Sequence, residues 1–530
     1  MLRNEAKPLT AKPAVRFTPR RAPMAIFVLS SYFVALGLLA LLGLHRLRLV
    51  AAATRGRGRL ANEAASPASP TPRVLVQLPL FNEALVAERL VRAAHALRWP
   101  PELLEIQILD DSTDETSAIL HRLVEELSTQ PGPKVTLLGR SDRSGFKAGA
   151  LARGLRESGA PFVAIFDADF VPCPDFLERT LSILLGDAEL GLVQARWGHL
   201  NRDQSWLTRA QATFLDAHFG IEHQGRVNLG ACFNFNGTAG VFRRSAIERA
   251  GGWSSRTVTE DLDLSYRAQL TGVRFAYVDS LVVPAELPES WNAFRAQQAR
   301  WVRGSVETAR HLLKPILTHS PWSVAVRAEA AVHLLSNVAY LLMALLAVLL
   351  PICVLLRDKL SFRVPGGVPL LSALDLSMLT AGTLAMLVFY SASAARRKIG
   401  FRLRDVLEIL FALSVGAGLS LSNAREVLLA LTSEQAEFVR TPKRGDVPNP
   451  KRLYRAPPGT KMAVLELVFA LYFLLAIGLA LQRELYAAIP FLLLYTTGFI
   501  AVGGGSLREA SARSALDWSS PPKVAPADRS

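Results

Sequence analysis

The sequence predicts an α/β domain with a mostly parallel sheet, embedded between transmembrane helices. Over residues 73–320, short apolar runs alternate with helical patterns, which is typical of βαβ units in a doubly wound sheet. Outside that region lie apolar stretches of about 20 residues, the length that crosses a bilayer. A hydrophobic content of 50% in 530 residues fits this combination better than a soluble protein.

The first apolar stretch, residues 24–44, is predicted to be an uncleaved membrane anchor. Arg46 and Arg48 follow it, in place of a small-residue cleavage site. We expect residues 1–23, which are basic and contain proline, to be a disordered tail, and residues 45–72 to be a linker. Behind the 73–320 domain we expect a membrane region over 329–503, a disordered tail over 504–530, and spans near 330–356, 370–394, 462–481 and 485–503.

The alternation inside the domain predicts its elements in order. Strands are expected at 74–78, 104–109, 134–138, 161–165 and 191–195. Helices are expected at 84–97, 115–127 and 148–157. Right-handed crossovers then give a parallel sheet whose strands all end at the same edge.

The net charge of +15 does not indicate a nucleic-acid partner. Basic residues gather beside the hydrophobic stretches, as in 46–59, 396–404 and 443–455. That distribution follows the positive-inside rule and fits anionic lipid headgroups. The three cysteines are scattered and form no metal-ligand spacing or disulfide framework, which fits a catalytic region in reducing cytoplasm.

Two carboxylates stand directly after the central strand 161–165. Asp167 and Asp169 are one residue apart, and ligands of open parallel sheets bind beyond the carboxyl ends of the strands. A carboxylate pair there suits a hard divalent cation, which can hold a diphosphate. Asp is also common after strands as a turn or cap residue, so the pair gains its weight from its surroundings.

The ends of the first two strands also carry polar residues. Glu83 follows the first strand, and Asp110 and Asp111 follow the second. Helix capping accounts for residues 112–114 but not for these two acids, which we interpret as hydrogen-bond partners of a ribose or a base. Lys147 opens the next helix, where either a phosphate contact or an exposed surface position fits.

Two later clusters complete the candidate site. Glu260 and Asp261 open a helical pattern, where capping is the alternative interpretation. Gln297, Arg300 and Trp301 share one face of a helix expected over 290–317. That helix is typical of an amphipathic element on the membrane, and an arginine fork beside an indole also suits phosphate and a sugar face.

Together these motifs stand in the order of a D, D, D, Q-x-x-R-W signature: Asp110-Asp111, Asp167-x-Asp169, Glu260-Asp261 and Gln297-x-x-Arg300-Trp301. The chain therefore resembles membrane-integrated processive glycosyltransferases of family 2, similar to cellulose synthases. The sequence at 77–83, 109–114 and 235–240 resembles that of the mannan and glucomannan 4-beta-mannosyltransferase-like branch. The resemblance covers 74–503 and implies a nucleotide-sugar-binding, GT-A-like fold.

The resemblance also implies a role for each matching residue. Glu83, Asp110 and Asp111 would hold the base and ribose, and Lys147 and Asp167 the nucleotide sugar. Asp169, with Asp167, would bind Mg²⁺ or Mn²⁺, and Asp261 would be the general base. The acceptor and diphosphate would meet the following residues: Asn236, Gly237, Thr238, Glu260, Gln297, Arg300 and Trp301.

One stretch departs from the family pattern, and a second bears on the membrane topology. The family's F-x-V-T-x-K loop closes over the nucleotide, and here Phe438, Thr441 and Lys443 match within a mobile loop over 433–461, while Arg440 replaces the valine. The apolar segment 405–432 has basic loops on both sides, so we expect it to lie at the interface or re-enter the membrane. Residues 194–197 repeat the letters Q, R and W with another spacing, and we assign them no part in the motif.

The expected function is inverting, processive β-glycosyl transfer that elongates a β-mannan, glucomannan or β-glucan and passes it through the membrane. Expected partners are GDP-mannose or UDP-glucose, the growing polysaccharide and membrane lipids, with no nucleic acid. The expected location is the bacterial inner membrane as a multi-pass protein, with the catalytic domain in the cytoplasm. Two alternatives stay open: transfer of a single sugar to a lipid carrier, and an inactive channel or scaffold.

Overall fold

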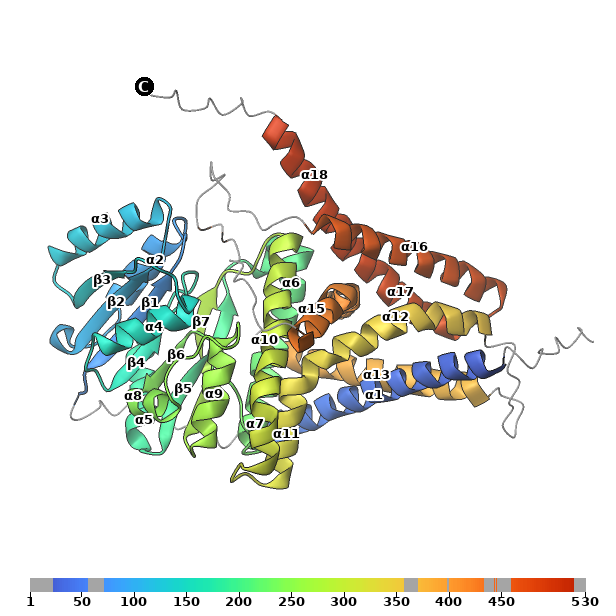
Figure 1. The fold of residues 1–530 in the computed structure, drawn as a ribbon, viewed down its shortest axis with the longest axis horizontal. Coiled ribbons are helices and arrows are strands. Elements are labelled where there is room, and N and C mark those ends of the chain that lie inside the picture. Colours follow the sequence, from blue (N-terminus) through green and yellow to red (C-terminus); the bar gives the residue numbers. More distant parts are fainter. Residues whose placement is uncertain are drawn as a thin grey trace, which may run out of the picture.

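The computed structural model describes residues 22–55, 71–356, 370–397, 400–432, 443, 445 and 459–518. A seven-stranded sheet has the strand order β3-β2-β1-β4-β6-β5-β7 (Figure 1). Every neighbouring pair is parallel except the two pairs made by β6, which runs antiparallel to β4 and β5. The predicted mostly parallel sheet is confirmed. Its strands are β1 Val74–Leu80, β2 Leu104–Asp110, β3 Lys134–Gly139, β4 Phe162–Ile165, β5 Leu190–His199, β6 Gly240–Arg243 and β7 Arg274–Ala285.

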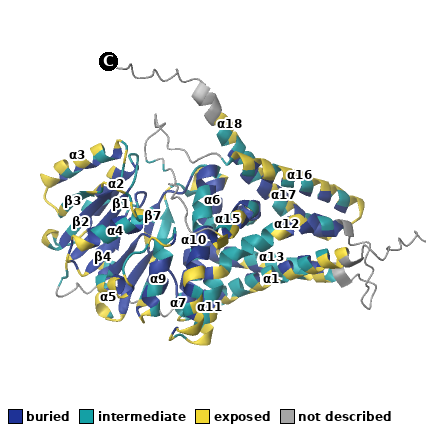
Figure 2. Cartoon of the chain, in the orientation of Figure 1, coloured by how far each residue is buried: buried dark blue, intermediate teal, exposed yellow. Residues whose placement is uncertain are grey.

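Helices cover both faces of this sheet, because successive side chains of its strands point to opposite sides. Val74 and Val76 of β1 belong to one hydrophobic cluster, and Leu75 between them belongs to another. The first cluster includes side chains of α2, α3 and α5, and the second those of α4, α8 and α9. Figure 2 shows the strands buried between these helices. The helices are α2 Ala87–His95, α3 Thr116–Ser128, α4 Phe146–Arg156, α5 Phe176–Gly186, α8 Arg244–Arg249 and α9 Glu260–Leu270.

A layer of helices lies between the sheet and the apolar half of the molecule (Figure 1). The longest is α10, which corresponds to the helix expected over 290–317 with nearly the same bounds. It packs against α9, α11 and α15. The six-residue π-helix η3 continues α6 into α7 within this layer. The layer contains α6 Trp206–Ala217, η3 His218–His223, α7 Gln224–Asn228, α10 Trp291–Thr318 and α11 Val324–Leu335.

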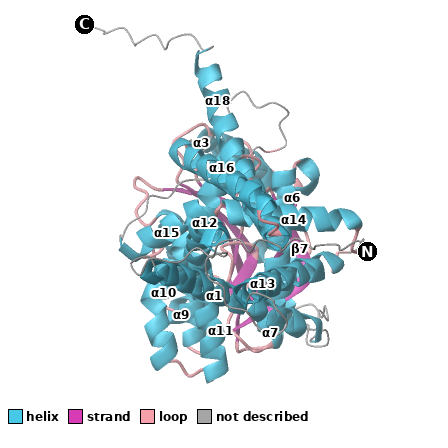
Figure 3. Cartoon of the chain, turned by 90° about the vertical axis from the view of Figure 1, so that its right-hand side faces the viewer, coloured by secondary structure: helices cyan, strands magenta, loops and turns pink. Residues whose placement is uncertain are grey.

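The apolar half has five helical segments that are long and apolar enough to cross a membrane, counted over the described residues, and we describe the chain as an integral membrane protein. Figure 3 shows these helices in front of the sheet. Leu36 of α1, Leu350 of α12 and Phe473 of α16 share one buried cluster. The main helices are α1 Ala22–Arg55, α12 Ala339–Leu356, α13 Leu370–Ala395, α16 Thr460–Gln482 and α17 Ile489–Phe499.

Two expectations about the ends of the membrane region are wrong. The linker expected from residue 45 is still helix, because α1 continues to Arg55 and buries Leu49 and Ala53 beside η3 and α13. The tail expected to be disordered over 504–530 begins with helix α18, Gly505–Trp518. Glu509 anchors α18 by accepting the backbone N–H groups of Trp291 and Asn292 at the start of α10.

The segment expected over 405–432 forms two helices, α14 Leu403–Gly418 and α15 Ser420–Thr432, bent by 47°. Such a pair fits a broken span or a re-entrant segment, so the expectation stays a prediction. Gly418 permits close packing at the bend, since a Cβ there would lie 2.3 Å from the carbonyl oxygen of Gly498. Of the loop expected over 433–461, Phe438 and Thr441 lie outside the described residues, whereas Lys443 is described.

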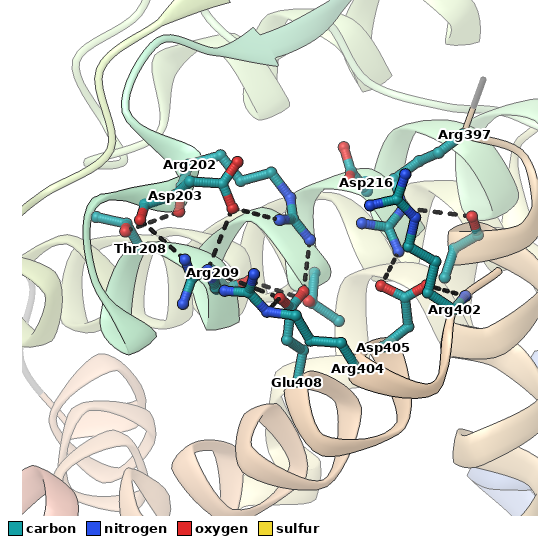
Figure 4. Close-up of polar contacts among 12 residues, drawn as sticks. Arg202, Asp203, Thr208, Arg209, Asp216, Arg397, Arg402, Arg404, Asp405 and Glu408 are labelled. Carbon is teal, nitrogen blue, oxygen red and sulfur yellow. Dashed lines mark hydrogen bonds and ion pairs between the residues drawn. The ribbon is translucent and has the colours of Figure 1, made fainter. Parts of the chain in front are cut away.

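Ion pairs fasten α14 to the layer beneath the sheet (Figure 4). Glu408 of α14 contacts Arg202 at 2.6 Å, Arg404 at 3.2 Å and Arg209 of α6 at 3.7 Å. Its side chain is only 3% exposed. One turn earlier, Asp405 pairs with Arg397 at 2.5 Å and accepts the backbone N–H of Arg402 at 2.6 Å. We call these seven residues, with Asp203 beside Arg202 and Arg209, the α6–α14 joint.

Candidate functional site

The carboxyl ends of the strands open into a cavity of about 190 Å³. Asp167 and Asp169 follow β4 and line this cavity from one side. The helix α10 approaches from the membrane side and contributes Gln297, Arg300 and Trp301. The structure therefore brings most of the predicted residues to one place: Glu83, Asp111, Lys147, Asp167, Asp169, Asn236, Gly237, Glu260, Asp261, Gln297, Arg300, Trp301 and Lys443.

Two predicted residues do not line this cavity. Asp110 accepts the backbone N–H of Ser112 at 2.9 Å and the hydroxyl of Ser117 at 2.5 Å, so its contacts are those of a local cap. Thr238 accepts the backbone N–H of Asp167 at 2.9 Å through its hydroxyl oxygen. It therefore holds the loop that carries Asp167, and the contacts expected between these two residues and a ligand stay predictions.

Lysine side chains neutralise the two carboxylates after β4. The Lys147 ammonium donates to Asp167 Oδ1 at 2.6 Å and to the carbonyl oxygen of Gly237 at 2.8 Å. Burial by itself lowers the pKa of Lys147, but Asp167 and Glu260 outweigh that effect, so the pKa is raised and the ammonium stays charged. Lys443 donates to Asp169 Oδ2 at 2.7 Å. Two cations thus already face the carboxylates expected to bind a metal.

Asp261 stands apart from these pairs electrostatically. Burial, followed by the like charge of Glu260, raises its pKa to about 7. The backbone N–H of Leu262 donates to its Oδ1 at 2.8 Å, and a Cβ on Gly237 would lie 2.9 Å from its Oδ2. Gly237 also has a φ of 81°, which suits glycine. The result is a carboxylate poised to accept a proton near neutral pH.

Arg300 supplies positive charge from the other side of the cavity. Burial lowers its pKa, while the nearby acids Glu260, Asp167, Asp261 and Asp169 act in the opposite direction. A guanidinium keeps its charge in such a site because its ordinary pKa exceeds about 12. An anionic ligand in the cavity would therefore meet Lys147 and Arg300 together.

Asp167 and Asp169 are the candidate ligands of a divalent cation. Over the described residues, no three His, Cys, Asp or Glu side chains converge as metal ligands. Mg²⁺ is ordinarily held by one or two carboxylates with the oxygens of a substrate's phosphates. Asp167 and Asp169 supply two such carboxylates, each paired with the ammonium group of a lysine side chain. The donor set therefore fits a cation that arrives with a diphosphate.

A second cavity of about 560 Å³ extends from this site among the membrane helices. Its walls include side chains of α1, α12, α13, α14 and α17. Six residues line both cavities: Trp197, Leu215, Asn236, Thr259, Asp261 and Trp301. The carboxylate of Asp261 thus lies at the junction of a polar pocket and a passage into the apolar half.

Sequence reasoning missed three kinds of residue that line the two cavities. Trp197, which received no role, sits in the second half of β5, and its position near the end of a strand was the signal for it. Arg143 lies in the β3–α4 connection with its guanidinium 3.3 Å from the ring centre of Phe81. His218 and Glu222 line the second cavity from η3, and no periodic pattern marks a π-helix in a sequence.

Comparison with known proteins agrees with this geometry. The family described as "Glycosyl transferase family group 2" matches residues 162–391. The chain is 35% identical over 451 residues to "Glucomannan 4-beta-mannosyltransferase 7" of Arabidopsis thaliana, covering 82% of this chain and 76% of that protein. The chain belongs to the family 2 glycosyltransferases, in their glucomannan 4-beta-mannosyltransferase branch. This glycosyltransferase is accordingly a nucleotide-sugar-dependent enzyme with a GT-A-like catalytic fold, as predicted.

A second relative supports the same assignment for the glycosyltransferase. "Probable glucomannan 4-beta-mannosyltransferase 9" of Oryza sativa subsp. japonica is 33% identical over 455 residues, covering 82% of this chain and 81% of that protein. A solved structure, "Mannosyltransferase PcManGT from Pyrobaculum calidifontis in complex with GDP-Man and Mn2+", covers 70% of this chain and 97% of its own, at 22% identity and a TM-score of 0.47. The two sequence relatives are plant proteins, so the expected bacterial inner membrane has no support.

Proposed function

We propose that this glycosyltransferase elongates a β-linked hexose polysaccharide from a nucleotide sugar, with inversion at the anomeric carbon. The observation that carries the proposal is the junction of the two cavities at Asp261 and Trp301. A polymerase needs one pocket for the activated donor and a separate space for the chain that accepts the sugar. Both relatives are named for 4-β-mannosyl transfer in glucomannan, which favours β-mannan or glucomannan over β-glucan as the product.

The smaller cavity is the proposed donor site. Asp111 and Glu83 lie at the ends of the first two strands, where they can accept hydrogen bonds from ribose hydroxyls or a base edge. Lys147 and Arg300 supply positive charge for the diphosphate. GDP-mannose and UDP-glucose both present these groups. Because the relatives are named for mannosyl transfer, GDP-mannose is the proposed donor.

A divalent cation, Mg²⁺ or Mn²⁺, is proposed at Asp167 and Asp169. When bound, it would neutralise charge on the departing nucleoside diphosphate. The side chain of Asp169 is 9% exposed and already pairs with the ammonium group of Lys443, so positive charge is favoured at that carboxylate. Lys147 would remain beside Asp167 and steady the same phosphates from within the protein.

Asp261 is the proposed general base. It would take the proton of an acceptor hydroxyl while that oxygen forms a bond to the anomeric carbon of the donor sugar. The bond from that carbon to the diphosphate breaks on the opposite side, which inverts the configuration. The proton then resides on Asp261, whose pKa of about 7 allows it to return to solvent. Trp301 lines both cavities and would offer an aromatic face to the terminal sugar of the chain.

The larger cavity is the proposed path of the product. Its volume of about 560 Å³ and its position among the membrane helices fit an extended sugar chain better than a single hexose. Processive elongation then follows if the new terminal sugar moves onto Trp301 after each transfer. We place the catalytic domain on the cytoplasmic side, where the basic segments beside the spans belong, and α14–α15 as a re-entrant pair on that side.

The deciding experiment supplies membranes containing the full chain with labelled GDP-mannose, UDP-glucose or UDP-N-acetylglucosamine in separate reactions. We expect a β-1,4-linked polymer from GDP-mannose, identified by linkage analysis and digestion with a β-mannanase. Excess chelator should abolish its formation, and added Mg²⁺ or Mn²⁺ should restore it. A product limited to one sugar on a lipid carrier would contradict processive elongation. Undiminished transfer in chelator would contradict the proposed dependence on a divalent cation.

A further inference from the structure

The π-helix η3 lies between the membrane anchor α1 and the loop that carries Asn236. Over the described residues, η3 contacts α1 and α6 and continues into α7. π-helical turns are rare and occur often at functional sites, because the extra residue in the turn re-aims its side chains. Here the side chains of His218 and Glu222 line the larger cavity together with Asn236. The arrangement connects these three side chains by hydrogen bonds.

In this network of hydrogen bonds, the chemistry of each group determines which atom donates and which accepts. His223 Nε2 lies 3.0 Å from the carbonyl oxygen of Asn234, which can only accept, so Nε2 carries the proton. The same Nε2–H also reaches Asn236 Oδ1, at 2.8 Å. Asn236 Nδ2 then donates to His218 Nε2 at 3.0 Å, and His218 Nδ1 donates to Glu222 Oε2 at 3.3 Å. Each histidine is thereby limited to one tautomer.

Glu222 is itself fixed by cations on two neighbouring elements. Arg46 of α1 donates to Glu222 Oε1, and Arg226 of α7 donates to Glu222 Oε2 at 3.3 Å. Arg226 is 1% exposed, and the side chain of Glu222 is 12% exposed. These ion pairs keep the pKa of Glu222 well below its ordinary value, against the opposing effect of burial. Glu222 therefore stays an acceptor for His218.

The consequence is a fixed orientation of the Asn236 amide at the junction of the two cavities. An Asn side chain can take part in four hydrogen bonds, two as donor and two as acceptor. One donor position is used by His218 and one acceptor position by His223. The remaining donor and acceptor belong to a side chain that lines both cavities, and that pair matches a sugar hydroxyl, which both donates and accepts.

We infer that His218 and Glu222 are positioning residues for the acceptor sugar and act through Asn236. Without His218, only the N–H of His223 would hold the amide of Asn236, and Asn236 Nδ2 would lose the partner that aims its second donor at the acceptor hydroxyl. This inference rests on the proposed function, because it takes the junction of the cavities as the acceptor site. It assigns His218 and Glu222 a role in acceptor binding and leaves donor binding to the smaller cavity.

The test uses the purified full chain in detergent or nanodiscs and the probe β-1,4-mannohexaose. His218→Phe keeps a ring of similar size but removes both bonds. We expect its affinity for the hexasaccharide, measured by calorimetry without donor, to fall about tenfold, the usual cost of an unsatisfied buried polar partner. The KM for GDP-mannose should stay within about twofold, since His218 lines the larger cavity and not the proposed donor site. His218→Gln, whose amide reaches the Nε2 position, should recover most of the acceptor affinity.

Two further variants separate positioning from a general effect on structure. In an Asn236→Ala background, His218→Phe should cause no additional loss of acceptor affinity, because residues acting through one another are not additive. His121→Phe is the control. His121 is exposed on α3 and lines neither cavity, so its loss should leave acceptor affinity unchanged. Glu222→Gln should weaken acceptor binding less than His218→Phe, since its amide oxygen still accepts from His218.

The outcomes separate this inference from the proposed function. Equal hexasaccharide affinity in His218→Phe and the parent would overturn the inference, as would additive losses with Asn236→Ala or an equal loss in His121→Phe. If the parent binds the hexasaccharide but extends it with none of the three donors, the proposed function is wrong and the positioning role stands. A parent that does not bind the hexasaccharide would overturn both.

Discussion

Two regions of the molecule gather arginines and carboxylates, and they use them differently. At the α6–α14 joint, Glu408 lies among Arg202, Arg209 and Arg404, so opposite charges surround each other (Figure 4). In the smaller cavity, Asp261 stands beside Glu260, and its pKa is raised to about 7. A pair of adjacent like charges costs stability, whereas in a mixed cluster each charge offsets the cost of burying its partners. The difference indicates where charge is arranged for chemistry and where for assembly.

The largest expected effect is on transfer by Asp261→Asn. Asparagine keeps the size of the side chain and removes the base, so the transfer rate should fall by roughly 10²–10⁴-fold, while donor affinity changes little. Asp203→Asn at the joint is the matched control, because its carboxylate is 71% exposed and pairs with arginines. Sugar incorporation and GDP-mannose binding are measured side by side. Near-parental incorporation by Asp261→Asn would rule out the base.

A smaller loss is expected from Asp169→Asn, and in a different quantity. Removing one of two carboxylates should weaken metal-dependent donor binding by roughly 10–100-fold, the range typical of changes around a metal ion. The dissociation constant of GDP-mannose is compared with and without Mn²⁺. Binding of the donor without metal should be nearly the same in both proteins. If the variant keeps the full stimulation by Mn²⁺, the cation is held elsewhere.

The pH dependence should separate activity from stability within the smaller cavity. Only the ionised form of Asp261 can accept a proton, so kcat/KM should fall about tenfold per unit as pH drops below the pKa of about 7. Stability changes in the opposite sense. Because the folded-state pKa lies above the ordinary 3.8, the contribution of Asp261 to stability is complete below that value and is lost as pH rises through 7. Asp261→Asn should therefore stabilise the protein at pH 8 more than at pH 5, in thermal unfolding measured at both values. A parent kcat/KM that is flat from pH 5 to 8 would contradict the assignment.

The sheet and the two carboxylates proposed to bind the cation could be predicted from the sequence for a physical reason. A buried strand reads as an apolar run, and the first polar residues after it must emerge at the sheet edge, which located Asp167 and Asp169. The antiparallel strand β6 was missed because Gly240–Arg243 has only four residues and no alternation. A run so short does not distinguish a strand from a turn.

The remaining features depend on contacts between distant parts of the chain. Arg202 and Glu408 pair across 206 positions, and His218 and Asn236 meet through a π-helix and a loop. Local periodicity carries no record of such pairings. The helix α18 was expected to be disordered, and its contacts with α10 and α16, among them the bond between Glu509 and the start of α10, account for its order.

The smallest effect on transfer, and the largest on stability, is expected from Glu408→Gln at the joint. The substitution leaves three arginines facing a neutral amide in a site where the carboxylate is 3% exposed, which typically costs about 3–5 kcal/mol. The melting temperature of the purified protein should fall clearly, while transfer per folded molecule at low temperature stays unchanged. Glu126→Gln is the control, since its pair with Arg92 is exposed on α3 and should be worth about 0–1 kcal/mol. Replacing the closest pair with apolar residues of similar size, as in Arg202→Met with Glu408→Leu, should recover part of the lost stability, because Arg209 keeps Asp203 as a partner and Arg404 is half exposed. If the folded fraction of Glu408→Gln instead loses transfer to the extent of Asp169→Asn, the joint takes part in the reaction and the contrast between the two regions fails.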